Sequence, residues 1–232
     1  MSGKVVMALS GGMDSSTLLA WLVDQGYVVR AYHFQYGSKH NPYERAAARA
    51  VADYYGVALE EVDLSTILSG FRSNLLKGGG EIPEGHYSEE NMSQTVVPAR
   101  NIIFLAIVTG FAWSVGASKV ALGIHRGDHA IYPDCRKEFY KAMDTAIYLG
   151  TDGRVEFLAP FVEWDKQKIL EWGIPAGVPY HLTRTCYKDQ PIACGRCGAC
   201  VERQEAFYLV GALDPVPYQD TKFWRGVSKI FE

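Results

Sequence analysis

The sequence predicts an α/β fold with a mostly parallel, doubly wound sheet, followed by a small helical element that carries cysteines. Strand-like apolar runs alternate with helix-like segments from residue 4 to residue 172, and repeated βα units imply a parallel sheet with helices on both faces. Four of the five cysteines then crowd between Cys186 and Cys200. We therefore expect an α/β domain over residues 1–180 and a cysteine-rich segment over residues 181–232 that packs on it as a single compact unit.

The first half of the chain contains three strand signals and two helix signals. An apolar run predicts a strand over residues 4–9, and the helix that follows, over residues 15–25, ends before a glycine suited to the C′ position. Valines and aromatics predict a second strand over residues 27–35. Asn41, Pro42 and Glu44 have the order of a cap, N1 and N3, which predicts a helix over residues 41–55. A third strand is expected over residues 58–62.

The second half resumes the alternation after a long break. Glycines, Pro83 and polar residues predict a loop over residues 70–92, and such loops are often lids, binding loops or disordered segments. The predicted helices are residues 102–115, 135–149 and 166–172, and the predicted strands are residues 119–124 and 155–158. Ligands of such sheets bind beyond the carboxyl ends of the strands, where the turn after residue 9 lies.

Composition narrows the class of protein. The chain has 232 residues, 48% of them hydrophobic, and a net charge of −3, which argues against a broad nucleic-acid surface. The N-terminal apolar run is too short for a signal peptide, and the apolar stretch over residues 102–113 is too short to span a bilayer. We expect a cytoplasmic protein with no membrane partner.

The turn Ser10-Gly11-Gly12-Met13-Asp14-Ser15-Ser16 lies between the first strand and the first helix. Backbone N–H groups at a helix N-terminus and the serine hydroxyls suit a phosphate, and the Asp14 carboxylate suits Mg²⁺. The alternative is an ordinary helix cap made by Ser or Asp. The turn lacks the G-x-x-x-x-G-K-[ST] pattern of a Walker loop, which directs attention away from γ-phosphate transfer.

The cysteines follow the spacing C-x7-C-x2-C-x2-C, formed by Cys186, Cys194, Cys197 and Cys200. Four clustered thiolates suit one tetrahedral zinc ion in a closed, structural site. An iron–sulfur cluster is the competing interpretation, because C-x2-C-x2-C also occurs in ferredoxin-type sites. Cys135 stands apart and is expected to be a simple buried residue.

The glycine turn resembles the SGG-x-DS loop of the ATP pyrophosphatases, the PP-loop enzymes with an adenine-nucleotide alpha hydrolase-like fold. Together with the cysteines, the stretches over residues 95–101, 132–136 and 185–187 resemble motifs of the 7-cyano-7-deazaguanine synthase (QueC) family. The chain departs from that family in three places. It has Tyr36-Gly37-Ser38 where Tyr-Gly-Gln is usual, and the residues just before Tyr132 differ from the usual sequence. The segment between Lys166 and Cys186 is also shorter than in familiar members.

The resemblance implies an ATP-dependent ligase. Such an enzyme adenylates the carboxylate of 7-carboxy-7-deazaguanine, lets ammonia form the amide, and activates the amide with a second ATP to give the nitrile preQ0. It also implies one structural Zn²⁺ per chain, Mg²⁺ with ATP, a homodimer and no direct contact with nucleic acid. Free ammonia or ammonia from a partner is expected.

The resemblance also assigns site residues. Asp14, Lys166 and Arg100 would be catalytic, although Lys166 alone suggests a surface lysine and Arg100 a helix cap. Asp134 would read the base or cap the helix after it. The complete expected sets are Ala8, Leu9, Ser10, Gly11, Gly12, Met13, Asp14, Ser15, Ser16, Thr17 and Leu18 for ATP, and Arg100, Asp128, Tyr132, Asp134 and Arg136 for the substrate. His125 and His129 are expected to be structural.

Two other functions remain open at this point. A PP-loop enzyme that thiolates or adenylates tRNA would share the ATP loop, but it predicts a basic face, an added RNA-binding domain and a catalytic cysteine pair. A non-catalytic nucleotide-binding or zinc-structured module would be favoured by a degraded loop, and this loop is intact.

Overall fold

The computed structural model describes residues 3–231, which contain a five-stranded sheet with every neighbouring pair of strands parallel. The strands lie in the order β3-β2-β1-β4-β5. Their bounds are β1 (Lys4–Ala8), β2 (Val28–Gln35), β3 (Ala58–Asp63), β4 (Lys119–Ala121) and β5 (Glu156–Leu158). The predicted α/β class and parallel sheet are confirmed.

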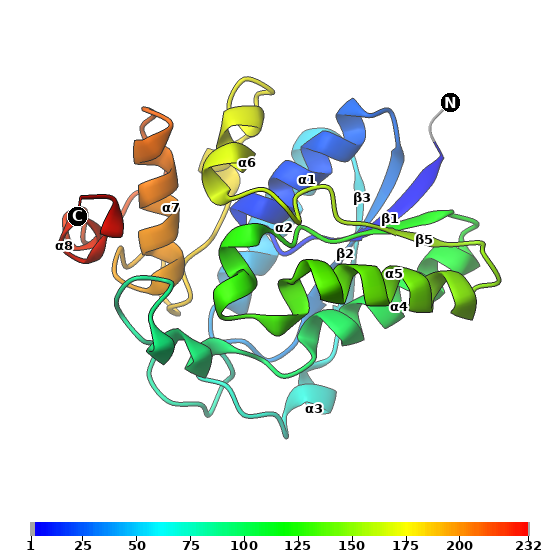
Figure 1. The fold of residues 1–232 in the computed structure, drawn as a ribbon, viewed down its shortest axis with the longest axis horizontal. Helices are drawn as coiled ribbons and strands as arrows, with labels where there is room; N and C mark the ends of the chain where they lie inside the picture. The colour runs from blue at the N-terminus through cyan, green and yellow to red at the C-terminus, as the bar shows by residue number, and fades with distance from the viewer. Residues whose placement is uncertain (1–2, 232) are drawn as a thin grey trace.

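Helices cover both faces of the sheet. Figure 1 shows α4 and α5 in front of the sheet and α1 and α2 behind it, with α7 and α8 beyond the carboxyl ends of the strands. The α-helices are α1 (Met13–Asp24), α2 (Asn41–Tyr55), α3 (Ser65–Leu68), α4 (Arg100–Ser114), α5 (Lys137–Gly150), α6 (Lys166–Gly173), α7 (Gly198–Leu209) and α8 (Phe223–Val227). Short 3₁₀ helices occupy Glu90–Thr95, Arg126–Ala130, Pro133–Cys135, Tyr180–Leu182 and Lys229–Phe231.

The central strand β1 is apolar on both sides, and this makes two cores. Val5 and Met7 face the core that holds α1 and α2, whereas Val6 and Ala8 face the core that holds α4. Successive side chains of a strand point to opposite faces, so a strand covered on both faces needs a continuous apolar run. Because β1 is buried on both faces, the position of the turn that follows it is fixed relative to the sheet.

Several element ends differ from the prediction. Helix α2 has Asn41 as its first residue and His40 as its cap, so the expected Asn cap was one residue off. Helix α5 begins at Lys137, because Pro133–Cys135 forms a separate 3₁₀ turn and Arg136 caps the helix. Strand β4 ends at Ala121, earlier than expected. The chain after it leaves the sheet and lines a pocket.

The loop over residues 70–92 packs against the cysteine segment. Glu84 forms an isolated antiparallel bridge with Cys197, and its carboxylate bonds Lys188 Nζ at 2.5 Å and Arg196 Nε at 2.6 Å. Four residues before Glu84 in the same loop, Gly80 O accepts from Lys39 Nζ at 2.5 Å. The loop thus joins the sheet to the C-terminal segment.

One segment, Glu90–Val115, is long and apolar enough to cross a membrane by composition. In the fold it is a 3₁₀ helix followed by α4, and Ala99 between them has a left-handed φ of 54°. Helix α4 packs against β1 and β4, with Leu105, Val108 and Ala112 fully buried. Its apolar character is that of a core helix.

Candidate active site and metal centre

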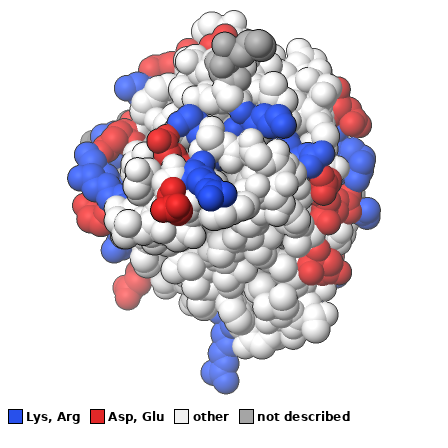
Figure 2. Space-filling model, turned by 90° about the vertical axis from the view of Figure 1, so that its right-hand side faces the viewer, with Lys and Arg blue, Asp and Glu red and all other residues white. Residues whose placement is uncertain are grey.

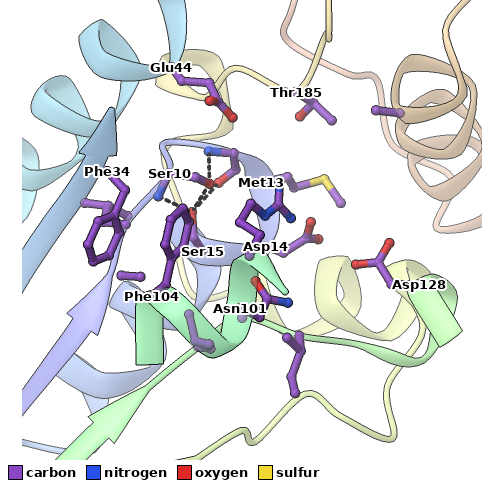
Figure 3. Close-up of a pocket in the computed structure, with 18 of the residues that line it drawn as sticks. Ser10, Met13, Asp14, Ser15, Phe34, Glu44, Asn101, Phe104, Asp128 and Thr185 are labelled. Atoms are coloured by element: carbon purple, nitrogen blue, oxygen red, sulfur yellow. Dashed lines mark hydrogen bonds between the residues drawn. The ribbon is translucent and has the colours of Figure 1, made fainter. Parts of the chain in front are cut away.

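A pocket opens beyond the carboxyl ends of β1 and β4, where the strand order reverses direction. That crevice is the usual ligand site of an open α/β sheet. Figure 3 shows side chains from the turn after β1 and from α1, β2, α2, α4 and the segment after β4 around one space. Of the predicted ATP residues, the pocket lining includes Ala8, Leu9, Ser10, Gly12, Met13, Asp14 and Ser15.

The first turn of α1 faces this pocket. Gly12 is the N-cap and has no side chain, so the predicted alternative of a Ser or Asp cap is wrong. Ser10 Oγ lies 2.9 Å from Ser15 Oγ and accepts from Gly12 N at 3.2 Å. The hydroxyls and the first N–H groups of the helix therefore gather at its positive end, which is an anion-binding arrangement.

The two glycines of the turn have different tasks. Gly11 has a φ of +83°, and a Cβ there would lie 2.4 Å from Ala48 N in α2. Gly11 is thus required where the turn touches helix α2, and it is absent from the pocket lining. Ser16, Thr17 and Leu18 also lie behind the pocket, with Thr17 Oγ1 bonded to Met13 O at 2.8 Å and Leu18 in the core.

A chain of alternating charges crosses the floor of the pocket. Lys166 Nζ lies 3.3 Å from Asp14 Oδ2 and 2.6 Å from Glu202 Oε2. His125 Nε2 lies 3.6 Å from Asp14 Oδ2 and 3.3 Å from Asp128 Oδ2. Three carboxylates from three parts of the chain are thus held around one lysine and one histidine.

The chain of charges fixes the ionisation of its members. Burial alone would raise the pKa of Asp14, but Lys166 and His125 outweigh it and hold that pKa well below its usual range. Burial opposes the charge of Lys166 too, yet Asp14 and Glu202 raise the pKa of Lys166. Asp14 is therefore an anion and Lys166 a cation at neutral pH.

Lys166 is 6% exposed, so the interpretation as a surface lysine is wrong. It is the first residue of α6, after Asp165, which caps that helix by accepting from Lys168 N at 2.9 Å. Its long side chain reaches the first turn of α1. Asp14 Oδ2 is engaged by this contact, whereas its Oδ1 is buried without a hydrogen-bond partner among residues 3–231.

Arg100 begins α4 and lines the pocket. Its guanidinium carbon lies 5.6 Å from the centre of the Tyr36 ring, and Nη1 is 3.4 Å from the Tyr36 hydroxyl. The N-cap of α4 is Ala99, and Arg100 is already the first helical residue, so the cap interpretation of Arg100 is wrong. The planar fork is free to face a carboxylate or a phosphate.

Three predicted substrate residues lie outside this pocket. Asp134 Oδ2 accepts from Asn101 N at 3.0 Å and so fixes the start of α4; the expected cap of α5 is wrong, because Arg136 fills that place. Arg136 is exposed and donates to His129 O at 2.9 Å. Tyr132 bonds Thr95 Oγ1 at 2.6 Å. Asp128 does line the pocket.

Sequence reasoning missed Glu44, Glu202 and the role of His125. Glu44 lies in the first turn of α2, lines the pocket and pairs with His40 Nε2 at 3.2 Å. Burial would raise the pKa of Glu44, but His40 lowers it below the ordinary value. His125 is 1% exposed. The sequence signal that could have drawn attention to Glu202 is its position two residues after Cys200, the last cysteine of the cluster.

His125, Asp128 and Glu202 are close enough to share a metal ion, with ligand atoms within 4.8 Å of one another. The hydrogen bonding favours another role. His125 Nδ1 accepts from Gly127 N at 3.1 Å, so a neutral ring carries its proton on Nε2, which faces the carboxylates as a donor. A metal would need the lone pair of that nitrogen, so this tautomer favours a charge contact with Asp14 and Asp128, to which Nε2 forms no hydrogen bond among the described residues.

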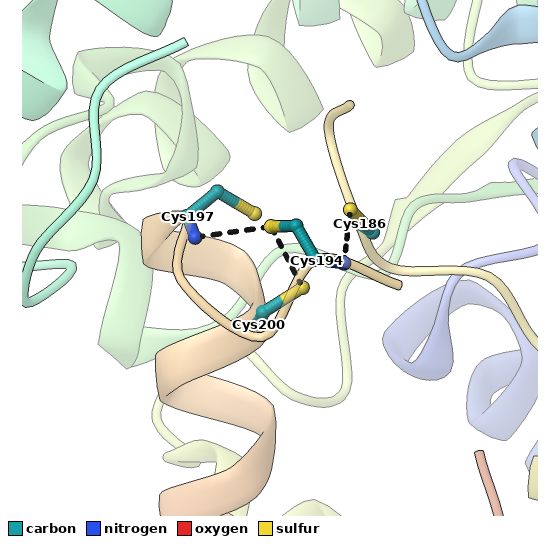
Figure 4. A group of neighbouring side chains, drawn as sticks. All are labelled: Cys186, Cys194, Cys197 and Cys200. Carbon is teal, nitrogen blue, oxygen red and sulfur yellow. Dashed lines mark hydrogen bonds between the residues drawn. The ribbon is translucent and has the colours of Figure 1, made fainter. Parts of the chain in front are cut away.

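The four predicted cysteines meet in one buried cluster, shown in Figure 4. Metal–sulfur bonds of about 2.3 Å in a tetrahedron put the sulfurs about 3.8 Å apart. Cys194 Sγ and Cys200 Sγ are 3.8 Å apart, and all four sulfurs lie within 4.8 Å of one another. This spacing suits a single ion, because the ligands of an iron–sulfur cluster bind different irons and spread farther apart.

Backbone N–H groups point at the sulfurs as they do toward thiolates. Cys194 N donates to Cys186 Sγ at 3.3 Å, and Cys197 N donates to Cys194 Sγ at 3.3 Å. Gly195 has a φ of +77°, and a Cβ there would lie 1.8 Å from Asp220 O. The cluster is therefore a prebuilt four-sulfur site, consistent with zinc. Cys135 lies apart, buried in the pocket wall.

The surface in Figure 2 carries Lys and Arg side chains interspersed with Asp and Glu. A nucleic-acid surface gathers positive charge into a patch or stripe. Several Lys and Arg side chains lie in a row across the upper half of this face, with Asp and Glu side chains beside them.

Comparison with known proteins gives one consistent family. The family model described as "Queuosine biosynthesis protein QueC" matches residues 4–211. The 7-cyano-7-deazaguanine synthase of Archaeoglobus fulgidus is 46% identical over 230 residues, which are 99% of this chain and 95% of that protein. The synthase of Caldicellulosiruptor saccharolyticus is 45% identical, over 95% of this chain and 98% of that protein. The synthase of Methanoregula boonei is 44% identical, over 93% of this chain and 99% of that protein.

Proposed function

The chain belongs to the QueC family of 7-cyano-7-deazaguanine synthases, ATP-dependent ligases of queuosine biosynthesis, and from this premise we propose how its pocket works. The pocket binds ATP and 7-carboxy-7-deazaguanine together and transfers AMP to the carboxylate. The meeting of Asp14, Lys166 and the α1 N-terminus in one pocket carries this proposal.

The chemistry requires activation of a poor electrophile. A substrate carboxylate oxygen attacks the α-phosphorus, the bond to the β-phosphate oxygen breaks, and pyrophosphate leaves. Ammonia then attacks the acyl carbon, displaces AMP and loses a proton, and the product is the amide. The amide oxygen attacks the α-phosphorus of a second ATP and releases a second pyrophosphate. Loss of AMP and of both N–H protons then gives the nitrile.

The residues act mainly by stabilising negative charge. The N–H groups and hydroxyls of Ser10, Gly12 and Ser15 hold phosphate oxygens, and Lys166 approaches the pyrophosphate as it departs. Arg100 binds the carboxylate or the phosphate beside it. Asp128 stays a candidate for contact with the substrate, whereas Tyr132, Asp134 and Arg136 act from outside the pocket by supporting its walls.

Two metals fit the residues present. Asp14 Oδ1, a buried carboxylate oxygen without a hydrogen-bond partner among the described residues, suits the Mg²⁺ that accompanies ATP. That ion would supply positive charge to the phosphates. Cys186, Cys194, Cys197 and Cys200 would hold one Zn²⁺ in a closed site, which stabilises the fold of the C-terminal segment.

The function of the enzyme also depends on its oligomeric state, its source of ammonia and its location in the cell. We propose that it works as a cytoplasmic homodimer, takes free ammonia or ammonia passed from a partner, and makes no direct contact with nucleic acid or membrane. Sedimentation of the purified protein measures the dimer, and a monomer at working concentration would contradict it.

One assay tests the central claim. The protein is mixed with 7-carboxy-7-deazaguanine, ATP, Mg²⁺ and ammonium, and both pyrophosphate and the base are followed. We expect pyrophosphate release that depends on the base, and a nitrile product by mass spectrometry. Pyrophosphate release that is indifferent to the base would refute the proposal.

A further inference from the structure

We propose that Glu202 is a positioning residue for Lys166, and that the four-cysteine cluster carries it into the pocket on helix α7. This inference rests on the proposed role of Lys166. It gives the cysteine cluster an indirect part in the chemistry, through the helix that the cluster holds.

The contact between Glu202 and Lys166 is short and enclosed. Lys166 Nζ donates to Glu202 Oε2 at 2.6 Å, and the residues are 6% and 7% exposed. A lysine has four rotatable bonds and a compact charge, so its direction depends on what holds its end. Glu202 holds that end together with Asp14, whose Oδ2 lies 3.3 Å from the same nitrogen.

The other oxygen of Glu202 is also confined. A Cβ at Gly127 would lie 2.6 Å from Glu202 Oε1, so the carboxylate packs directly against this glycine. Gly127 belongs to the turn that presents His125 and Asp128. Glu202 therefore sits between α6 and that turn and cannot move without disturbing one of them.

The cysteines fix the helix that bears Glu202. Cys197 is the N-cap of α7, and Cys200 lies in its first turn, so two of the four sulfurs are built into the start of the helix. Glu202 follows Cys200 by two residues, and α7 packs against α6. Binding of an ion by the sulfurs thus sets the position of Glu202 relative to Lys166.

The test compares Glu202 with Glu205 on the same helix. Glu205 is 2% exposed, and its Oε1 lies 3.4 Å from His86 Nε2, whereas the ion pairs of Lys166 are with Asp14 and Glu202. We expect Glu202→Ala to lower kcat for pyrophosphate release about 100-fold while KM for ATP changes less than about threefold. Glu202→Gln keeps an acceptor and should recover about tenfold of that loss, and Glu205→Gln should leave kcat within about twofold.

A double-mutant cycle separates action through Lys166 from a general effect on folding. If Glu202 acts through Lys166, Lys166→Ala/Glu202→Ala has the same kcat as Lys166→Ala within about threefold. The inference would be overturned if the fold-loss in kcat of the double variant equalled the product of the fold-losses of the two single variants. Equal losses of kcat in Glu202→Ala and Glu205→Gln would also overturn it. If Lys166→Ala alone kept full activity, the proposed role of Lys166 would fail first, which is a distinct result.

A second variant guards against misfolding of Glu202→Ala. Gly127→Ala keeps every charge but pushes a methyl group to 2.6 Å from Glu202 Oε1, its nearest neighbour, and to 3.0 Å from the His125 ring. We expect kcat to fall about tenfold with the metal content unchanged, and acetic anhydride to modify Lys166 faster, as mapped by peptide mass spectrometry. Wild-type labelling and kcat in Gly127→Ala would overturn the inference independently of the first test.

Discussion

Lys166 Nζ lies 3.3 Å from Asp14 Oδ2, and this contact joins the start of α6 to the first turn of α1. The pair sets an anion and a cation side by side at the mouth of an anion-binding helix end. The cation can follow the charge that develops on pyrophosphate, while the anion keeps one oxygen free for a metal.

Replacing Asp14 tests the metal role. We expect Asp14→Asn to lower kcat for pyrophosphate release at least about 100-fold, because the amide keeps the shape but loses the negative charge that we propose binds Mg²⁺. Steady-state kinetics over a Mg²⁺ titration measures the effect. Asp24→Asn, at the exposed end of the same helix, is the control, and wild-type kcat in Asp14→Asn would show that the ligand lies elsewhere.

Replacing Cys197 tests the metal centre. We expect Cys197→Ser to lose bound zinc and stability together, since the free energy of binding at a structural site is also free energy of folding. Metal analysis and thermal unfolding measure both quantities. Cys135→Ser, a buried cysteine outside the cluster, should keep its zinc. A brown wild-type preparation that absorbs near 400 nm would instead indicate an iron–sulfur cluster.

Gly11 is predicted to be the least replaceable glycine of the turn. Gly11→Ala places a methyl group 2.4 Å from Ala48 N at a φ of +83°, so we expect a loss of about 2–4 kcal/mol in the free energy of unfolding. Gly110→Ala, in α4 with open space around its Cβ, should gain up to about 1 kcal/mol. Urea unfolding compares them, and equal effects would contradict this account.

Glu44 predicts a dependence of stability on pH. Its pKa is lowered in the folded state, so its contribution is present above the unfolded value of 4.5 and disappears as the pH falls through the folded pKa. We expect Glu44→Gln to lower the free energy of unfolding by about 2 kcal/mol at pH 7. In acid, where the Glu44 side chain is protonated and as neutral as Gln, we expect no difference between the two proteins. Glu60→Gln, half-exposed on β3, should show little change at either pH. A constant cost across pH would point to packing instead.

The fold was predictable where local pattern and tertiary role agree. The glycine turn, the five strands and helices α1, α2, α4, α5 and α6 follow from apolar periodicity and caps. The C-terminal element was expected to be helical, but α7 could not be delimited, because nearly every side of it is buried and its charges are covered by ion pairs. It therefore lacks the apolar stripe that reveals a surface helix.

The site was predictable only in the parts that are contiguous in sequence. Asp14 can be recognised from the sequence because it belongs to a turn of consecutive residues. The cysteines can be recognised because their short spacing is a sequence pattern. Glu202 and His125 matter because they meet Lys166 and Asp14, and such meetings are set by packing between distant segments. Asp134 illustrates the converse: its place suggested a cap for α5, yet it holds the start of α4.

The position of the cysteines near the C-terminus has a consequence for how the protein matures. The last strand of the sheet ends at Leu158, so the ribosome delivers the whole sheet before it delivers Cys186. Domains fold as they emerge, and the sheet can therefore assemble while the metal ligands are still inside the ribosome. The new chain would carry an assembled glycine turn before its four cysteines can meet, so Lys166 gains its contact with Glu202 only after the segment that bears the cysteines has packed against the sheet.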